Sequence, residues 1–306
     1  MLHVIRSTFA LLLLVSSLLL LPVARVSAQE ATSEASPVSA QSGIFDGPVD
    51  IGGRSLYLEC SGVGAPTVIL EGGLDTAATQ QFVPIVPGIA RFTRVCAYDR
   101  ANLGLSDAAP KPRTVADMAD DLHALLAAAH VPGSYVLVAA SYGGLVTRLF
   151  AHTYPTEVAG IVLIDSTHED GDADLEQTLG PQLWAELLAT GFMESVEGID
   201  FATSNEQVRR ARASSPLPTV PVISLTAPLP TDEPFEPGWP LAMNDVFRAE
   251  NADLATLAPG ERWIVVEGSG HNIHYDRPAV VIDAVRDVVD AVRDPSTWAT
   301  DATPVP

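Results

Sequence analysis

The sequence has few cysteines, few aromatic side chains and few basic residues. Its 306 residues include two Cys, 6% aromatic residues and 17 Lys and Arg against 38 Asp and Glu, for a formal net charge of −21. Nucleic acids and anionic membranes need a positively charged protein surface, so we expect neither as a partner. Charged residues make up only 18% and hydrophobic residues 47% of the chain, which excludes a disordered protein. The length suffices for one large domain or two smaller ones.

Long apolar runs are also scarce, and the clearest one lies at the N-terminus, from about Phe9 to Leu21. Arg6 precedes it, and Val26-Ser27-Ala28 supplies small residues of the kind found at signal-peptide cleavage sites. The run is short for a bilayer span, which needs about 20 residues. We predict a signal peptide at residues 1–28 and a protein secreted or held in the cell envelope. No stable membrane insertion of the mature chain is expected; an uncleaved anchor is the alternative.

The two cysteines, Cys60 and Cys96, both lie after this segment, in the strand-like stretches SLYLEC and RVCAYD. An even number of cysteines in an exported protein favours a disulfide. Two buried free thiols that pack as small hydrophobic groups are the other interpretation.

The chain after the signal segment divides into a linker, one large domain and a tail. Residues 29–43 are rich in Ser and Ala and lack periodicity, which predicts a disordered linker. Short β-rich runs then recur through residues 44–293, and residues 294–306 are predicted to be a flexible tail. The expected strands are Arg54–Glu59, Thr67–Leu70, Arg94–Tyr98, Tyr135–Ala139, Gly160–Ile164, Val220–Thr226 and Arg262–Glu267. From the third onward these runs are continuously apolar, as in strands buried on both faces.

Helical patterns separate these strands. Thr114 can cap a helix with Asp117 in its first turn, another helix runs from Gly143 to Tyr154, and Pro278 begins the last. Alternating strands and helices predict an α/β fold with a doubly wound, mostly parallel sheet. Residues 166–218 contain no strand pattern, only amphipathic segments. We predict that they form a helical cap over the carboxyl ends of the strands, where open α/β sheets bind ligands.

One serine stands at a sharp strand-to-helix junction, in VLVAASYGGL at residues 136–145. Ser141 follows the apolar run, with Ala139 and Gly143 on either side of it. Small residues at these positions are typical of a tight turn that exposes a nucleophilic serine. The amide of Tyr142 would then lie at a helix N-terminus, where it can donate to an oxyanion. A serine that only caps the following helix is the structural alternative.

A histidine in a glycine-rich loop after the last strand supplies the base that this serine needs. His271 lies in the stretch EGSGHNIHYDRP, directly before the last helix. Imidazole has the pKa for general-base catalysis near neutral pH, and the order Ser then His suits this sheet topology. His274 is the competing residue, but the Gly270-His271 junction is better suited to an exposed loop.

These stretches, together with VILEGGLDTAATQQF and FTRVCAYDRANLGLSD, resemble the α/β-hydrolase superfamily, most closely its secreted bacterial serine hydrolases of the esterase and lipase type. The resemblance implies an eight-stranded sheet with the cap inserted after the sixth strand. It also implies that the loop Glu71-Gly72-Gly73-Leu74 supplies a second oxyanion amide, from Leu74 or Gly73, with Leu74 preferred. Glu71 stands where relatives more often have histidine, and Asn102 where they have glycine.

A serine hydrolase also needs a carboxylate that orients the histidine, and the sequence is least decisive about this residue. Most relatives place an aspartate after the seventh strand, and Asp232 is a candidate there. The sixth strand ends in GIVLID, and pancreatic-type lipases use an aspartate at that point, which favours Asp165.

We therefore predict a secreted serine hydrolase that cleaves a carboxylic ester through Ser141, His271 and Asp165, with a small-molecule ester or acyl compound as its substrate. An amide-bond hydrolase of the aminopeptidase type and a catalytically silent binding protein of the same fold are the alternatives. No cofactor is implied. The stretch Asp170–Asp174 lacks the glycine and glutamate of a calcium loop, so no metal is expected.

Overall fold

The computed structural model describes residues 43–235 and 238–298. The predicted signal peptide, all of the predicted linker except Gly43, and residues 299–306 of the predicted tail lie outside this part. The described start of that tail, Asp294–Trp298, contains the turn η2 (Pro295–Thr297). The Arg262 guanidinium lies 4.0 Å from the Trp298 ring centre, so this segment is packed on the domain rather than free.

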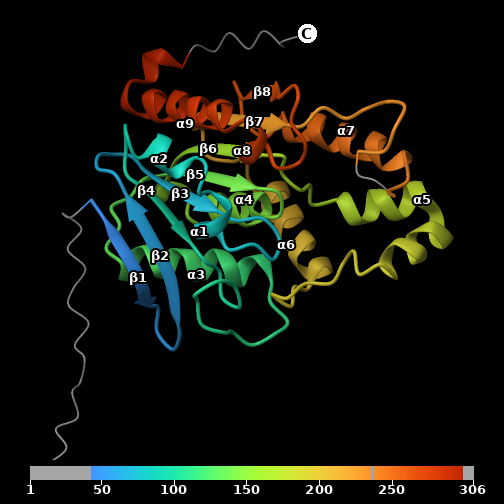
Figure 1. Cartoon of the computed structure of the whole chain (residues 1–306), viewed down its shortest axis with the longest axis horizontal. Helices are drawn as coiled ribbons and strands as arrows, with labels where there is room; N and C mark the ends of the chain where they lie inside the picture. The colour runs from blue at the N-terminus through green and yellow to red at the C-terminus, as the bar shows by residue number, and fades with distance from the viewer. Residues whose placement is uncertain (1–42, 236–237, 299–306) are drawn as a thin grey trace, which may run out of the picture. The chain divides into compact units, whose positions relative to one another are not determined.

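The core is one eight-stranded sheet in the order β1-β2-β4-β3-β5-β6-β7-β8 (Figure 1). The pairs β1–β2 and β2–β4 are antiparallel, and all the others are parallel. This confirms the predicted fold class and adds one strand, β1, which sequence periodicity did not reveal. The strands are β1 (Phe45–Asp50), β2 (Ser55–Ser61), β3 (Thr67–Glu71), β4 (Val95–Tyr98), β5 (Tyr135–Ala140), β6 (Val158–Ile164), β7 (Val222–Thr226) and β8 (Arg262–Val265).

Helices cover both faces of the sheet (Figure 1). In β5, Leu137 packs in the same apolar cluster as α3 and α4, whereas Val136 and Val138 pack in the cluster that contains α2 and α9. Burial on both faces explains why the central strands are continuously apolar. The helices are α1 (Ala78–Gln81), α2 (Val86–Ile89), α3 (Val115–Ala128), α4 (Gly143–Thr153), α5 (Gly171–Leu188), α6 (Phe201–Ser214), α7 (Ala242–Leu254), α8 (Ile273–Asp276) and α9 (Pro278–Arg293), with the 3-10 turn η1 at Pro155–Glu157.

Two local expectations have clear structural outcomes. The helix at Thr114 begins with a capping box, in which Thr114 and Asp117 bond to each other's backbone amides. The prediction that the last strand is buried on both faces is wrong. β8 is an edge strand that pairs only with β7, so the side chains of Trp263 and Val265 are exposed.

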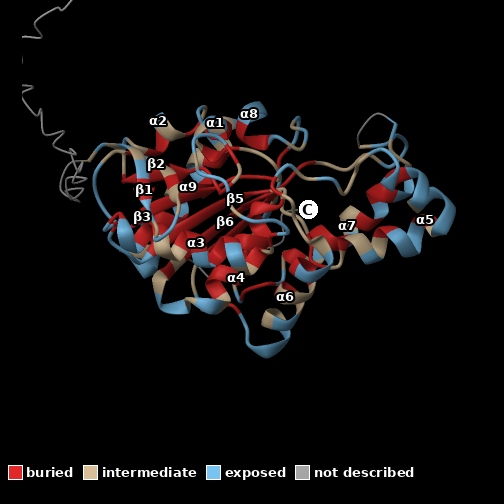
Figure 2. Ribbon diagram, turned by 90° about the horizontal axis from the view of Figure 1, so that it is seen from below, coloured by how far each residue is buried: buried red, intermediate tan, exposed pale blue. Residues whose placement is uncertain are grey.

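The predicted cap interval, residues 166–218, contains α5 and α6, but these two helices have different neighbours. α6 packs against α3 and α4, whereas α5 packs against α7, which follows β7 and lies outside the predicted interval. Figure 2 shows α5 and α7 close together, and the ribbon of each helix has both buried (red) and exposed (pale blue) stretches. Met243 and Val246 of α7 share an apolar cluster with Leu175 and Leu179 of α5. The helices beside the sheet therefore come from two segments of the chain, the predicted interval with α5 and α6 and the segment after β7 that contains α7.

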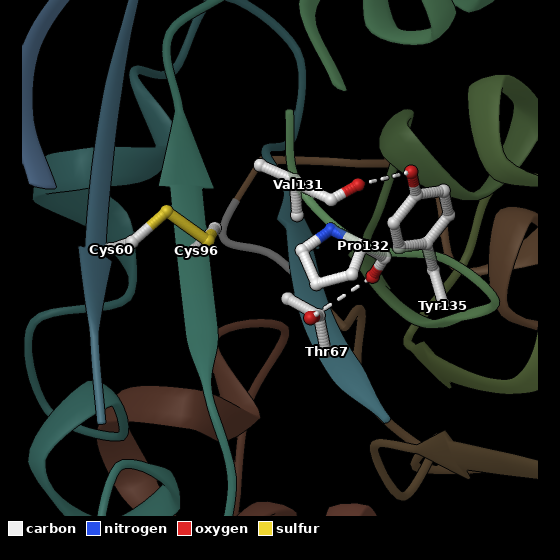
Figure 3. Close-up of a disulfide and its surroundings, with 6 residues drawn as sticks. All are labelled: Cys60, Thr67, Cys96, Val131, Pro132 and Tyr135. Atoms are coloured by element: carbon white, nitrogen blue, oxygen red, sulfur yellow. Dashed lines mark hydrogen bonds between the residues drawn. A yellow bond between two sulfur atoms is a disulfide. The ribbon is translucent and has the colours of Figure 1, made fainter. Parts of the chain in front are cut away.

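A disulfide joins Cys60 and Cys96, as Figure 3 shows. The two residues lie directly opposite each other on the antiparallel strands β2 and β4, with their Cα atoms 4.0 Å apart. The predicted bridge is thus present, and the free-thiol interpretation is wrong.

Candidate active site

Ser141 lies at the turn between β5 and α4, at the carboxyl end of the parallel strands. Its φ angle of 50° is in the left-handed region, which a residue with a side chain adopts only under constraint. Backbone hydrogen bonds hold the turn: the Ser141 amide donates to Ile164 O at 3.0 Å, and the Ser141 carbonyl accepts from Thr167 N at 3.1 Å. The hydroxyl is thereby carried to the edge of the sheet where β5 and β6 end.

The two glycines after Tyr142 are required by close packing. A Cβ on Gly143 would lie 2.5 Å from the Gly72 carbonyl oxygen, and one on Gly144 would lie 1.8 Å from Ser166 Oγ. Either contact would force the turn away from the loop after β3 or from the end of β6. The small residues around Ser141 are therefore explained by neighbours that are distant in sequence.

His271 and Asp165 are hydrogen-bonded, with Nδ1 and Oδ2 2.7 Å apart. Asp165 directly follows β6 and is held in place, since its second carboxyl oxygen accepts from Ala227 N at 2.9 Å. Its own amide donates to Leu225 O at 2.7 Å. The other candidate acid, Asp232, is exposed in the loop after β7. The structure thus brings Asp165 to the imidazole.

His274 belongs to the packed interior instead. Its side chain is 1% exposed, and its ring centre lies 5.3 Å from that of Phe82. Burial, followed by the neighbouring His271, lowers the pKa of His274 to about 4. A neutral, buried imidazole of this kind is not suited to exchange protons with a substrate at neutral pH.

Two backbone segments supply candidate oxyanion donors. Tyr142 is the N-cap residue of α4, and amides at a helix N-terminus have no partner within the helix. The loop after β3 passes beside the serine, since a Cβ on Gly73 would lie 3.5 Å from Ser141 Cβ. The Gly73 amide already donates to Gln81 Oε1 at 2.9 Å, so of the two predicted residues Leu74 is the better candidate.

A buried ion network supports this loop. Arg100 Nη1 donates to the Gly72 carbonyl and Nη2 to the Gly73 carbonyl, each at 2.6 Å. The same guanidinium forms ion pairs with Glu71 and with Glu197, again at 2.6 Å. Glu71 therefore serves as an anchor for the arginine, and burial raises its pKa.

Two residues of this network, Arg100 and Glu197, were not predicted from the sequence. Arg100 stands in the stretch CAYDRANLG, two residues after the end of β4, and an arginine so close to a buried strand was the available signal. Asn102 in the same stretch adopts a left-handed φ of 74°, which asparagine tolerates better than most residues. Its side chain donates to the Glu197 carbonyl at 3.2 Å. Nothing local marks Glu197, which lies in the loop between α5 and α6.

The candidate residues open into a cavity of about 550 Å³, between the sheet edge and the helices α5, α6 and α7. Ser141, Asp165 and His271 line it, together with Tyr142, Leu74 and Gly73. Its remaining walls are mainly apolar and aromatic, but two carboxylates, Asp172 and Glu250, also face it. Burial raises the pKa of both, that of Glu250 to about 8.

Neither a membrane span nor a metal cluster is found in the described residues. None of their helices combines the length and apolar character needed to cross a bilayer. Within residues 43–235 and 238–298, no group of three or more His, Cys, Asp or Glu side chains is arranged to hold a metal ion.

The chain is similar in sequence to proteins of one large enzyme family. The sequence model of the alpha/beta hydrolase family matches residues 76–284. The Bacillus subtilis (strain 168) uncharacterized protein YqjL is 25% identical over 222 residues, which cover 72% of this chain and 83% of YqjL.

Two solved structures are similar in fold. The enol-lactonase from Burkholderia xenovorans LB400 has a TM-score of 0.53 and 17% identity, over 79% of this chain and 99% of that one. Wild-type Cfl2 from Burkholderia cenocepacia has a TM-score of 0.60 and 18% identity, and the match covers 81% of this chain and 96% of Cfl2. At such identities the likeness shows a shared fold, not a shared reaction.

Proposed function

The chain belongs to the α/β-hydrolase family, and we propose that it is a secreted serine hydrolase that cleaves carboxylic esters through Ser141, His271 and Asp165. One observation carries the proposal. The hydrogen-bonded pair His271–Asp165 lines the same cavity as a serine held in a left-handed turn at a helix N-terminus. This set contains a nucleophile, a base and a group that orients the base.

In the proposed reaction, Ser141 Oγ attacks the ester carbonyl carbon while His271 removes its proton. The Asp165 carboxylate holds the imidazole in the required tautomer and stabilises the imidazolium that forms. The amides of Tyr142 and Leu74 donate to the oxyanion, and His271 then protonates the departing alcohol. Water, deprotonated by His271, attacks the acyl-enzyme, releases the acid and regenerates the serine.

The amide-bond hydrolase and the silent binding protein remain the competing functions. Ester cleavage is proposed first because an alcohol leaves more readily than an amine, so a site that cleaves amides also cleaves activated esters. The orientation of His271 by Asp165 supports an active site over a silent one.

The deciding experiment combines turnover with covalent labelling. Wild-type protein would be assayed on p-nitrophenyl esters from acetate upward, beside Ser141→Ala and the control Ser214→Ala, an exposed serine on α6. We expect turnover in the wild type and control and none above background in Ser141→Ala. A fluorophosphonate should add to Ser141, as read by peptide mass spectrometry. Absence of both turnover and labelling would exclude the serine-hydrolase function. A kcat/KM on p-nitroanilides that equals or exceeds that on the p-nitrophenyl esters of the same acids would favour the second candidate.

Export is part of the proposal. The N-terminal signal pattern supports it, and so does the Cys60–Cys96 bridge, because stable disulfides are typical of oxidising compartments. N-terminal sequencing of protein recovered from the medium or envelope should begin at Gln29. An intact Met1 terminus in the cytoplasmic fraction would contradict export.

A further inference from the structure

One buried carboxylate in the active-site cavity has no role in the proposed hydrolysis. Glu250, on α7, is 7% exposed and lines the cavity that contains Ser141. Its Oε1 atom is buried and has no hydrogen-bond partner among the described residues. A buried acceptor without a partner is costly, which points to a group that a ligand completes.

The charged groups around Glu250 leave it without a cation. Four nearby carboxylates, Asp174, Asp172, Asp170 and Glu169, raise its pKa further after burial. Arg209 pairs with Asp170 at 2.7 Å, and Arg148 pairs with Glu169. Within the described residues, neither Lys nor Arg lines the cavity, so no basic side chain of its wall would compensate a negative charge on Glu250.

A second acidic residue of the cavity, Asp172, lies on α5. It also lines the cavity, and one of its carboxyl oxygens accepts from Asn205 Nδ2 at 2.8 Å. The Glu250 carboxylate lies beside the start of the same helix, since a Cβ on Gly171 would be 3.3 Å from Glu250 Oε1. The two acids therefore come from the packed helices α5 and α7, which hold them together.

Aromatic rings complete the surroundings. Phe192, Trp239 and Phe247 line the cavity. The ring centres of Phe192 and Trp239 are 5.8 Å apart, and those of Trp239 and Phe247 are 6.0 Å apart. Aromatic faces attract organic cations, and this attraction strengthens when the cation leaves water. Carboxylates combined with aromatic walls are suited to an alkylammonium group, which has both a charge and apolar substituents.

We propose that Glu250, with Asp172 and the rings of Phe192, Trp239 and Phe247, binds an ammonium group of the substrate. This deepens the proposed function, on which it rests: the ester cleaved at Ser141 carries a protonated amine in its acyl or alcohol part. The N–H of that ammonium donates to Glu250 Oε1, and the alkyl substituents pack on the rings. The net charge of −21 favours approach of such a cation.

A neutral Glu250 that donates a hydrogen bond to an uncharged substrate is the competing explanation. The variant Glu250→Gln separates the two, because glutamine keeps shape and donor capacity but cannot become negative. Glu176→Gln is the matched control, since Glu176 is exposed on α5 and does not line the cavity.

The test uses two pairs of esters that differ only in charge. One pair is a p-nitrophenyl hexanoate with a terminal dimethylammonium group and its isostere with a terminal isopropyl group. The other carries the same two groups on the alcohol of a butanoate ester. We expect at least one pair to show a preference for the cation of about tenfold or more in kcat/KM, the order of a hydrogen bond to a charged group. Glu250→Gln should abolish the preference, whereas Glu176→Gln should keep it.

Binding without turnover makes the result independent of catalysis. Calorimetry would measure the Kd of hexyldimethylammonium and that of an uncharged alcohol of similar size, each on the wild type and on Glu250→Gln. Tighter, Glu250-dependent binding of the cation supports the site even if no ester is cleaved. Equal binding of both compounds, or a cation preference that survives in Glu250→Gln, overturns it while Ser141 labelling and ester turnover leave the hydrolase function standing.

Discussion

Arg100 and Glu197 lie 97 residues apart in sequence and form a buried ion pair through two hydrogen bonds of 2.7 and 2.6 Å. The side chain of Arg100 is 4% exposed, and Glu197 is completely buried. Because the same arginine holds the carbonyls of Gly72 and Gly73, the pair connects the loop between α5 and α6 to the candidate oxyanion loop. Asp75 reinforces this connection by accepting from the Glu197 amide at 3.1 Å.

Loss of that pair should reduce both stability and activity. Glu197→Gln leaves part of a buried guanidinium charge uncompensated, and breaking such a pair typically costs about 3–5 kcal/mol. We expect urea denaturation to show a loss of this order and esterase assays to show a lower kcat with little change in KM. Removal of the exposed Arg210–Glu206 pair by Arg210→Ala is the control and should change neither quantity. Wild-type stability in Glu197→Gln would mean that the pair is not a structural anchor.

The assignment of the acid can be tested by a matched pair of variants. Asp165→Asn keeps an oxygen that can accept from Ala227 N but no longer stabilises the imidazolium. We expect kcat to fall by about 10⁴ with the fold retained, as judged by circular dichroism. Asp232→Asn, in an exposed loop, should behave as wild type. The reverse outcome would move the acid to the loop after β7.

The disulfide should contribute measurably to stability. Cys60 and Cys96 are separated by 36 residues, and closing a loop of this kind typically stabilises a domain by about 2–4 kcal/mol. Dithiothreitol should therefore lower the unfolding midpoint of the wild type in urea. The double variant Cys60→Ala/Cys96→Ala should unfold at a similar lowered midpoint and should not respond to reductant. A reductant-sensitive double variant would show that the effect has another origin.

Glu250 should make the protein less stable as the pH rises. Its pKa is raised by burial and by neighbouring carboxylates to about 8, above about 4.3 in an unfolded chain. The folded state therefore keeps a proton that the unfolded state releases, so stability declines between about pH 4.5 and pH 8. Relative to Glu250→Gln, the wild type should lose on the order of 4 kcal/mol over this range.

The effect of Glu250 is seen only in the difference between the wild type and Glu250→Gln, because other groups also make stability depend on pH. Glu261 has a pKa raised by burial to about 7, and it acts in the same direction in both. Urea titrations at pH 5, 7 and 9 would give the difference directly. If stability changed with pH in the same way in the wild type and in Glu250→Gln, Glu250 would have an ordinary pKa. The conclusion that it is buried without a compensating cation would then be contradicted.

Local patterns in the sequence determined much of the fold. The continuous apolar runs of the central strands arise because each strand packs on both sheet faces, as Leu137 and Val138 of β5 do. The capping box at Thr114 is likewise decided by neighbours within a few positions. The turn at Ser141 is visible in the local pattern, but residues distant in sequence, Ile164 and Thr167, hold it in place. β1 escaped notice because only Val49 of its residues is buried, so its pattern carries little apolar signal.

The tertiary structure alone decided which distant groups meet. The contact of His271 with Asp165, the pairing of Arg100 with Glu197 and the burial of Glu250 beside Asp172 all join separate elements. Charged residues of this kind occur mostly on surfaces, so their composition and spacing do not distinguish a solvated carboxylate from a buried one. The path of the chain around the sheet makes that distinction, because it sets which residues lose water and which partners replace it.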